Sequence, residues 1–207
     1  LGHHVISPFE IPAHWERIKG IDYGFAAPSA CMWAAVDPED GTLIIYRELY
    51  KKGLTGSELS AIITEMERDE MRSIPGVLDT AAWAQAGGAY RGPTIGEVLV
   101  NSGHKLRRAD KNRIAGKVQF HERLRVDRNT GRPKMQIFSS CPNIINELQS
   151  LPTDKSRPED VDTHAEDHAY DALRYLIMSR PRLEGHSSRM ARFKSEVFQP
   201  SDNIFGY

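Results

Sequence analysis

Short apolar segments with partly alternating polar positions dominate the first fifty residues, and they predict β-strands. Strands are expected over 17–23, which contains Asp22 near its end, and over 29–37 and 42–50. The segment 38–41 between the last two strands has a proline to fix φ and a glycine to permit positive φ, which favours a tight turn. The front of the chain is therefore expected to form an antiparallel meander.

Helical spacing of apolar residues first appears after Thr55, which with Glu58 three residues later has the pattern of a capping box. This helix is expected to run through Glu70. Downstream, the pattern predicts further elements in alternation: strands at 73–79 and 105–108, helices at 95–100, 112–124 and 142–151, a hairpin within 126–138, and a last helix from a cap at Thr163 to a stop before Pro181.

The order of these elements predicts an α/β fold with a mixed β-sheet flanked by α-helices and an added β-hairpin. Residues 17–180 are expected to form the single domain. Residues 1–16 have no periodicity and are expected to form an irregular lead-in, and the polar residues 181–207 are expected to form a tail.

Composition narrows the class of protein. The chain has 207 residues, of which 40% are hydrophobic, so it can form a core and is not wholly disordered. No segment reaches the about 18 consecutive apolar residues of a membrane-spanning helix, and the N-terminus lacks the layout of a signal peptide. We therefore expect no membrane partner. Cys31 and Cys141 are too few for a disulfide framework or a four-cysteine zinc site, and are expected in the core or in loops.

The formal net charge of −1 conceals a separation of charge along the sequence. Residues 104–134 contain eleven Lys and Arg against three acidic residues, whereas residues 154–171 contain seven acidic residues against two basic ones. This separation indicates a surface for a polyanion beside a site for cations. The alternative is a pair of solvated faces that neutralise each other, and composition does not decide between the two.

Two aspartates close short apolar strands. Asp22 and Asp79 are each followed by small or flexible residues, so both side chains are expected to emerge at one end of a sheet, where open α/β sheets bind ligands. The alternative is that these aspartates only end strands and begin turns.

A third group of polar side chains lies within 163–175. At about 100° per residue, four of them share one arc of a helix: His164, Asp167, His168 and Asp171. Alanines on the adjoining arc would let the helix approach the sheet closely and bring Asp171 beside the strand-end aspartates. The alternative is a solvated polar face with an aspartate that favours the helix dipole.

Converging carboxylates repel one another unless cations neutralise them, and oxygen ligands favour Mg²⁺ or Mn²⁺ over zinc. Two such ions, about 3.5–4 Å apart, can activate a water and stabilise the leaving oxygen during attack on a phosphodiester. Basic residues would then hold the nucleic-acid backbone through its phosphates. The candidates are Lys105, Arg107, Arg108, Lys111, Arg113, Lys117, Arg128, Arg132 and Lys134.

Three motifs resemble the nuclease domain of tailed-bacteriophage terminase large subunits, the motors that package DNA. They are GIDYG at 20–24, VLD at 77–79 and EDHAYDALRY at 166–175. The helix motif is the most specific, and the order and spacing of all three strengthen the resemblance, which covers about residues 15–180. The resemblance implies an RNase H-like fold and a metal-dependent endonuclease that cuts concatemeric double-stranded viral DNA during packaging.

The resemblance also implies site residues and partners. Asp22, Asp79 and Asp171 correspond to an acidic triad, and His168 to a histidine that contributes to the metal site in some relatives. Asp167 lies on the edge of the same face and is expected to be an outer ligand. The implied partners are double-stranded DNA, the portal protein and the small terminase subunit, and the implied location is the host cytoplasm rather than the mature virion.

One departure from the family concerns ATP. In full-length relatives an ATPase domain with a Walker A loop precedes the nuclease, but here Gly116-Lys117 is followed by Val118, and Lys111 stands where the first glycine belongs. The chain is therefore expected to be a fragment that cuts DNA without translocating it. Residues 1–16 would be the remnant of the linker to the ATPase domain.

Three other functions remain open from the residues. An RNase H-like recombinase or transposase usually supplies glutamate as its last carboxylate, and Glu166 is the nearest candidate. A zinc hydrolase would use His164 and His168, but Ala165 stands where its glutamate belongs. A catalytically silent DNA-binding or assembly module would keep the basic residues and need no converging carboxylates.

Overall fold

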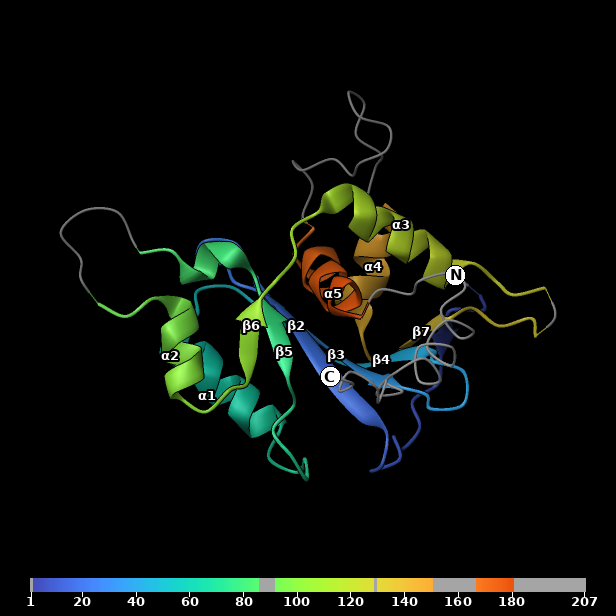
Figure 1. Cartoon of the computed structure of the whole chain (residues 1–207), viewed down its shortest axis with the longest axis horizontal. Coiled ribbons are helices and arrows are strands. Elements are labelled where there is room, and N and C mark those ends of the chain that lie inside the picture. Colours follow the sequence, from blue (N-terminus) through green and yellow to red (C-terminus); the bar gives the residue numbers. More distant parts are fainter. Residues whose placement is uncertain (1, 86–91, 129, 151–166, 181–207) are drawn as a thin grey trace, which may run out of the picture.

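Seven strands form one mixed sheet in the computed structural model, which describes residues 2–85, 92–128, 130–150 and 167–180 (Figure 1). The strands are β1 (Val5–Ile6), β2 (Glu16–Asp22), β3 (Ser29–Val36), β4 (Leu43–Lys51), β5 (Gly76–Leu78), β6 (Leu106–Arg108) and β7 (Met135–Phe138). Their order across the sheet is β1-β7-β4-β3-β2-β5-β6. The predicted meander is confirmed, because β3 pairs antiparallel with both β2 and β4, while the other pairs are parallel.

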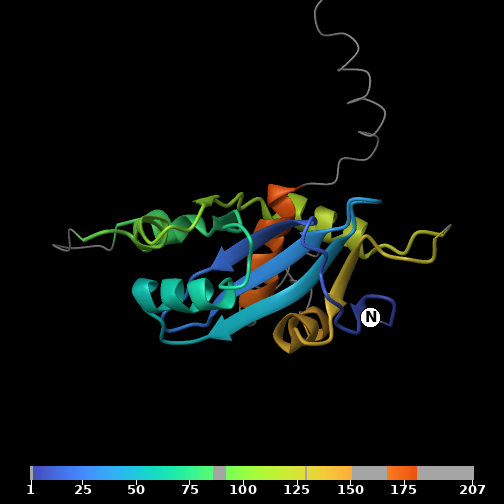
Figure 2. The same cartoon turned by 90° about the horizontal axis from the view of Figure 1, so that it is seen from below.

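Helices cover both faces of this sheet (Figures 1 and 2). They are α1 (Gly56–Met66), α2 (Ile95–Asn101), α3 (Arg113–Leu124), α4 (Pro142–Ser150) and α5 (His168–Ser179), with a short 3₁₀ helix at Thr80–Trp83. Alternate residues of β3 point to opposite faces, so Met32 belongs to the core under α3, α4 and α5, whereas Trp33 belongs to the core under α1 and α2. The predicted α/β fold with flanking helices is confirmed.

Helix α5 packs directly on β2 because both elements have small residues where they meet. A Cβ atom on Gly20 would lie 2.2 Å from the backbone oxygen of Ala172, so only glycine fits there. Ala169 and Ala172 are fully buried, as the alanines on the packing face predicted. This close approach brings the beginning of α5 to the carboxyl end of β2.

Two further expectations are confirmed. The capping box of Thr55 and Glu58 begins α1, although this helix ends at Met66 rather than Glu70. Cys31 and Cys141 are both free and buried in the core. No helix within the described ranges is long and apolar enough to cross a bilayer.

The expectation of a wholly irregular lead-in is wrong. Val5–Ile6 forms the edge strand β1, which pairs in parallel with β7. A strand of two residues is too short to produce a periodic pattern, so no sequence signal could reveal it. The expected tail at 181–207 lies outside the described residues.

The second hairpin is much shorter than predicted. Its turn is closed by a single antiparallel bridge between Val126 and Pro133, and residues 135–138 instead form β7, which pairs in parallel with β4. The prediction that these residues form a strand is therefore confirmed, but the strand that pairs with them, β4, lies more than eighty residues earlier in the chain.

The last helix begins later than predicted. It begins at His168 with Asp167 as its N-cap residue, while the expected cap at Thr163 lies outside the described ranges. Asp167 therefore precedes the helix and does not share its arc with the other polar residues.

Candidate active site

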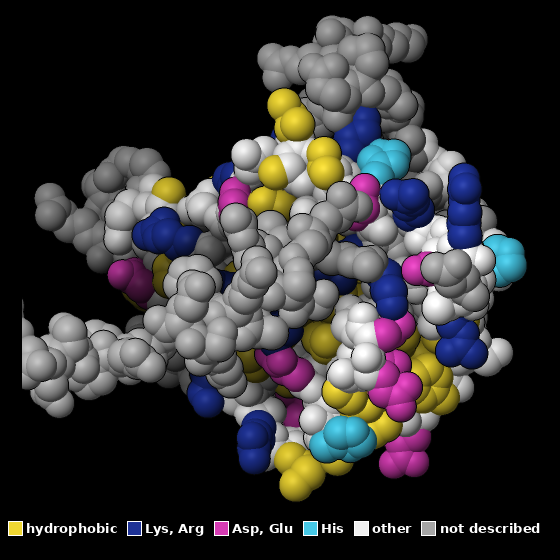
Figure 3. All heavy atoms as spheres, turned by 45° about the vertical axis from the view of Figure 1, so that its right-hand side comes forward, with side chains coloured by type: hydrophobic (Ala, Val, Ile, Leu, Met, Phe, Trp, Pro, Cys, Tyr) yellow, Lys and Arg dark blue, Asp and Glu magenta, His cyan; other side chains and the backbone are white. Residues whose placement is uncertain are grey.

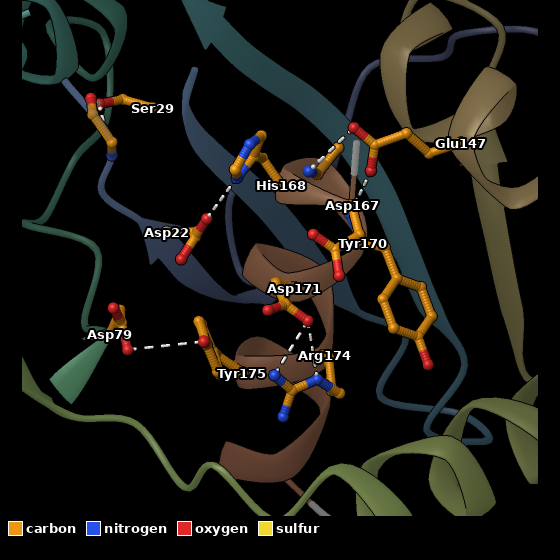
Figure 4. A network of polar contacts seen from close by, with 12 residues as sticks. Asp22, Ser29, Asp79, Glu147, Asp167, His168, Tyr170, Asp171, Arg174 and Tyr175 are labelled. Atoms are coloured by element: carbon orange, nitrogen blue, oxygen red, sulfur yellow. Dashed lines mark hydrogen bonds and ion pairs between the residues drawn. The ribbon is translucent and has the colours of Figure 1, made fainter. Parts of the chain in front are cut away.

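Two of the predicted aspartates lie at the same end of the sheet (Figure 4). Asp22 is the last residue of β2, and Asp79 follows β5, the strand that pairs in parallel with β2. The Asp79 backbone N–H donates to the carbonyl oxygen of Ile21 at 3.0 Å, which continues the pairing beyond β5. Both carboxylates therefore leave the carboxyl ends of neighbouring parallel strands, and their position at one end of the sheet is as predicted.

The first turn of α5 faces these strand ends (Figure 4). His168 Nδ1 lies 3.0 Å from Asp22 Oδ2, although the two residues are 146 positions apart in the chain. Asp171 follows three residues later, in the same first turn of α5. The structure thus gathers Asp22, Asp79, Asp171 and His168 from three separate segments around one end of the sheet.

Donor groups already contact two of these carboxylates. Lys111 Nζ lies 2.8 Å from Asp79 Oδ1, and the Tyr175 hydroxyl donates to the same oxygen at 3.5 Å. Arg174 donates from Nε and Nη2 to Asp171 Oδ1 at 3.0 and 2.9 Å. With His168 beside Asp22, each carboxylate of the group lies next to a basic side chain.

The carboxylates also act on one another through their charges. Burial raises the pKa of Asp22, the hydrogen bond from His168 opposes that rise, and the charges of Asp171 and Asp79 add to it. The hydrogen bond to Asp22 raises the pKa of His168, which favours an imidazolium beside this carboxylate. Burial and the charges of all three aspartates raise the pKa of Tyr175, so its hydroxyl stays protonated. The site is a cluster of coupled negative charge.

Asp167 is a fourth acidic group at the edge of this cluster. Burial and the charge of Asp171 raise the pKa of Asp167 to about 6. Its Oδ2 accepts from Arg113 Nη2 at 3.4 Å, and its side chain does not cap α5. The carboxylate is therefore held beside the site, although Asp167 stands outside the helix.

The donor set fits a hard divalent cation better than a soft one, because its main groups are carboxylate oxygens. Burial raises the pKa of Asp22, and the charges of Asp171 and Asp79 add to this rise through repulsion that a bound cation would relieve. Within the described ranges, however, no three Asp, Glu, His or Cys side chains converge closely enough to form a metal-ligand group. Metal ligation by Asp22, Asp79, Asp171, His168 and Asp167 stays a prediction.

The nine basic residues proposed to hold DNA fall into separate places. Lys105, Arg107 and Arg108 are exposed at the edge strand β6 or just before it. Lys111 and Arg113 face acidic groups of the site, and Lys134 forms an ion pair with Asp40. The remaining three are Lys117 on α3 and the exposed Arg128 and Arg132 in the turn before β7. On the face in Figure 3, basic side chains are interspersed with acidic ones.

Three residues of the site were not expected from the sequence. Arg174 lies three positions after Asp171, a spacing at which helical side chains meet, so that pair was open to prediction. Tyr175 reaches Asp79 across 96 residues, and Glu147 of α4 accepts hydrogen bonds from the N-terminus of α5. No local pattern indicates these long-range contacts. Glu166 and His164, which the alternative functions require, lie outside the described residues.

Solved phage proteins share this fold. The nuclease domain of the P22 large terminase has a TM-score of 0.68 and 18% identity over 86% of this chain and 88% of that chain. The large terminase of a thermophilic bacteriophage has a TM-score of 0.70 and 17% identity over 86% of this chain and 42% of that chain. The nuclease domain of g2p, the large terminase of bacteriophage SPP1, solved with bound Mn, has a TM-score of 0.57 and 15% identity over 84% of this chain and 93% of that chain.

At these identities the likeness establishes the fold alone. That fold is the RNase H-like fold of terminase nuclease domains, as the motifs implied. No protein-family model matches the sequence, and no curated protein sequence matches it.

Proposed function

We propose that this chain is a metal-dependent DNA endonuclease domain that acts in viral DNA packaging. The observation that supports it most is the position of Asp22, Asp79 and Asp171 around one end of the sheet, at the carboxyl ends of two parallel strands and in the first turn of α5. The likeness in fold to terminase nuclease domains, one of them solved with bound Mn, supports the same activity.

In this proposal the three aspartates hold two Mg²⁺ or Mn²⁺ ions. Such ions, when bound, lower the pKa of a coordinated water and stabilise the leaving oxygen of a phosphodiester. His168 orients the Asp22 carboxylate through its hydrogen bond, and Arg174 orients Asp171 in the same way. Asp167 supplies an outer oxygen at the edge of the site.

The residues of the site would contact phosphate or metal and no base edges, so cleavage is expected to be largely independent of sequence. The exposed side chains Lys105, Arg107 and Arg108, at β6 or just before it, are candidates to hold the DNA backbone. Lys111 and Arg113, which already face carboxylates, would contribute charge next to the reacting phosphate.

The biological setting belongs to the same proposal. The substrate would be concatemeric double-stranded viral DNA in the host cytoplasm, and the partners would be the portal protein and the small terminase subunit. The domain would work beside an ATPase domain in a longer chain, since its likeness to the large terminase of the thermophilic bacteriophage covers only 42% of that protein.

A plasmid-digestion assay with Mn²⁺, Mg²⁺ and chelator tests the activity. We expect cutting at many sites with either ion, none with excess chelator, and none in Asp22→Asn, Asp79→Asn or Asp171→Asn. Each variant should keep a cooperative thermal transition, because each removes one of several repelling charges. Undiminished cutting in excess chelator, or cutting at one site only, would exclude this function.

A second function is favoured by the ion pairs themselves. Lys111 beside Asp79 and Arg174 beside Asp171 neutralise the carboxylates within the protein, as a catalytically silent DNA-binding module would. A measurement of metal binding distinguishes the nuclease from the silent DNA-binding module. The nuclease proposal expects Mn²⁺ binding that Asp171→Ala weakens, and a silent module expects no such binding in either protein.

A further inference from the structure

The carboxylate of Glu147 caps helix α5 from a neighbouring helix. Its Oε1 accepts from the backbone N–H of Ala169 at 3.2 Å, and its Oε2 accepts from the N–H of Tyr170 at 2.8 Å. These N–H groups belong to the second and third residues of α5, which have no partner within their own helix. Glu147 is buried on α4, 22 positions before Ala169 in the chain.

An N-cap side chain ordinarily takes one of these hydrogen bonds, and aspartate is among the best residues for it. Asp167 occupies the N-cap position of α5 but makes no such bond. Glu147 already accepts hydrogen bonds from the N–H groups of Ala169 and Tyr170. The Asp167 carboxylate instead accepts a hydrogen bond from Arg113 and lies within the electrostatic influence of Asp171.

Helix α4 is held in the same manner from the sheet. Glu48 of β4 accepts from the backbone N–H of Asn143 at 2.9 Å and from that of Ile144 at 3.1 Å, at the beginning of α4. Glu48 therefore links β4 to α4, and Glu147 links α4 to α5, each by accepting hydrogen bonds from the N-terminal N–H groups of the following helix. The first turn of α5, which contains His168 and Asp171, is thereby fixed relative to the sheet that contains Asp22.

We infer that Glu147 is a positioning residue of the nuclease site. It sets the first turn of α5 so that His168 and Asp171 face the strand ends, and it releases Asp167 from capping so that this carboxylate lies at the site. The inference rests on the proposed function, since the site it positions is the proposed metal site.

The variant Glu147→Gln tests this inference, with Glu97→Gln as the matched control. Glu97 also caps a helix, because its Oε2 accepts from the Thr94 N–H at 2.7 Å, but its helix α2 contributes no residue to the site. We expect Glu147→Gln to weaken Mn²⁺ binding, measured by calorimetry, by about 10-fold or more, as outer-shell changes commonly do. The turnover number for plasmid cleavage should fall with it, while the KM for DNA stays unchanged.

Amide hydrogen exchange measured by NMR reports the capping without any metal or DNA. The N–H groups of Ala169 and Tyr170 should exchange about 10-fold faster in Glu147→Gln than in wild type, which corresponds to a loss of about 1.4 kcal/mol of protection. In Glu97→Gln they should exchange at the wild-type rate. Glu147→Asp, which keeps the charge on a shorter side chain, should restore part of the metal affinity. A purely structural role of Glu147 would lower the melting temperature of Glu147→Gln and leave its metal affinity at the wild-type value.

The two proposals fail in different ways. A wild-type protein that neither binds Mn²⁺ nor cuts DNA overturns the proposed function and this inference with it. A wild-type protein that does both, together with a Glu147→Gln variant that matches Glu97→Gln in metal affinity and turnover, overturns the inference alone.

Discussion

The ammonium group of Lys111 lies 2.8 Å from Oδ1 of Asp79, although Lys111 belongs to the basic segment that the sequence assigns to DNA. The lysine side chain is 48% exposed, whereas that of Asp79 is 10% exposed. A divalent cation at Asp79 would share this carboxylate with a positive charge. In the proposed function, this contact would link DNA binding by Lys111 to metal binding by Asp79.

Replacing Lys111 should change metal affinity and cleavage in opposite directions. We expect Lys111→Met to bind Mn²⁺ up to about fivefold more tightly without DNA, the equivalent of the ~1 kcal/mol typical of an exposed ion pair. Cleavage should become slower, because the variant lacks a positive charge beside the phosphate. Lys105→Met, at an exposed lysine outside the site, is the control for calorimetric affinity. Weaker Mn²⁺ binding in Lys111→Met would instead show that the lysine supports the metal site.

Gly20 should tolerate no side chain. An alanine Cβ at this position would lie 2.2 Å from the oxygen of Ala172 and 2.8 Å from Cβ of Leu176, so α5 would have to move away from β2. We expect Gly20→Ala to lower the free energy of unfolding by about 3 kcal/mol or more, in the range of strongly overpacked cores. Urea titration followed by circular dichroism measures this decrease.

Gly41→Ala is the control for that experiment. Gly41 has a φ of +73° but open space around the missing Cβ, so its substitution costs only backbone strain of about 1–2 kcal/mol. Equal decreases in the two variants would mean that α5 does not press on β2 as closely as the structure indicates.

Asp167 should make the metal-free protein less stable as pH rises. Its pKa is raised from 3.8 to about 6, so the folded state binds its proton more tightly than the unfolded state does. Any stability that this preference gives is present below about pH 4 and disappears as pH rises through about 6. Asp167→Asn should therefore melt at a higher temperature than wild type at pH 7 and at nearly the same temperature at pH 4.

Asp40→Asn provides a control of opposite sign. Burial would raise the pKa of Asp40, but hydrogen bonds from Lys134 and Thr42 outweigh it and lower this pKa. The ionised carboxylate stabilises the fold above the unfolded pKa, so Asp40→Asn should lower the melting temperature at pH 7. If both variants shift the melting temperature in the same direction at pH 7, the assignment of Asp167 to a repelling cluster is wrong.

The edge of the sheet at β6 should account for part of the salt dependence of DNA binding. Neutralising Lys105 and Arg107 together should reduce the slope of log affinity against log salt concentration by roughly 0.9 for each phosphate that the protein no longer neutralises. Lys134→Gln, at a lysine that pairs with Asp40, should leave the slope unchanged. An unchanged slope in the double variant would move the DNA surface to the turn that contains Arg128 and Arg132.

Much of the fold could be predicted from local pattern, because its strands alternate and its helices have recognisable caps. The position of Asp22 and Asp79 at one end of the sheet could be predicted because each closes a short apolar strand, and open α/β sheets bind ligands at strand ends. The strand β1 and the parallel pairing of β7 could not be predicted, since both depend on partners far away in the chain.

The details of the site were less accessible. A helical wheel placed Asp167 inside the last helix, but the helix begins one residue later, and Glu147 supplies its cap from another element. The contacts of Lys111 with Asp79 and of His168 with Asp22 likewise join segments that only the tertiary fold brings together. The sequence pattern indicated which residues lie at the candidate site, and tertiary packing determines which side chains each of them contacts.

The most direct measurement of the central claim is anomalous X-ray scattering from crystals of the wild-type chain grown with Mn²⁺. We predict two anomalous peaks about 4 Å apart among Asp22, Asp79 and Asp171, with both peaks absent from crystals of Asp171→Asn. Strong peaks elsewhere, with none at these three carboxylates, would contradict it.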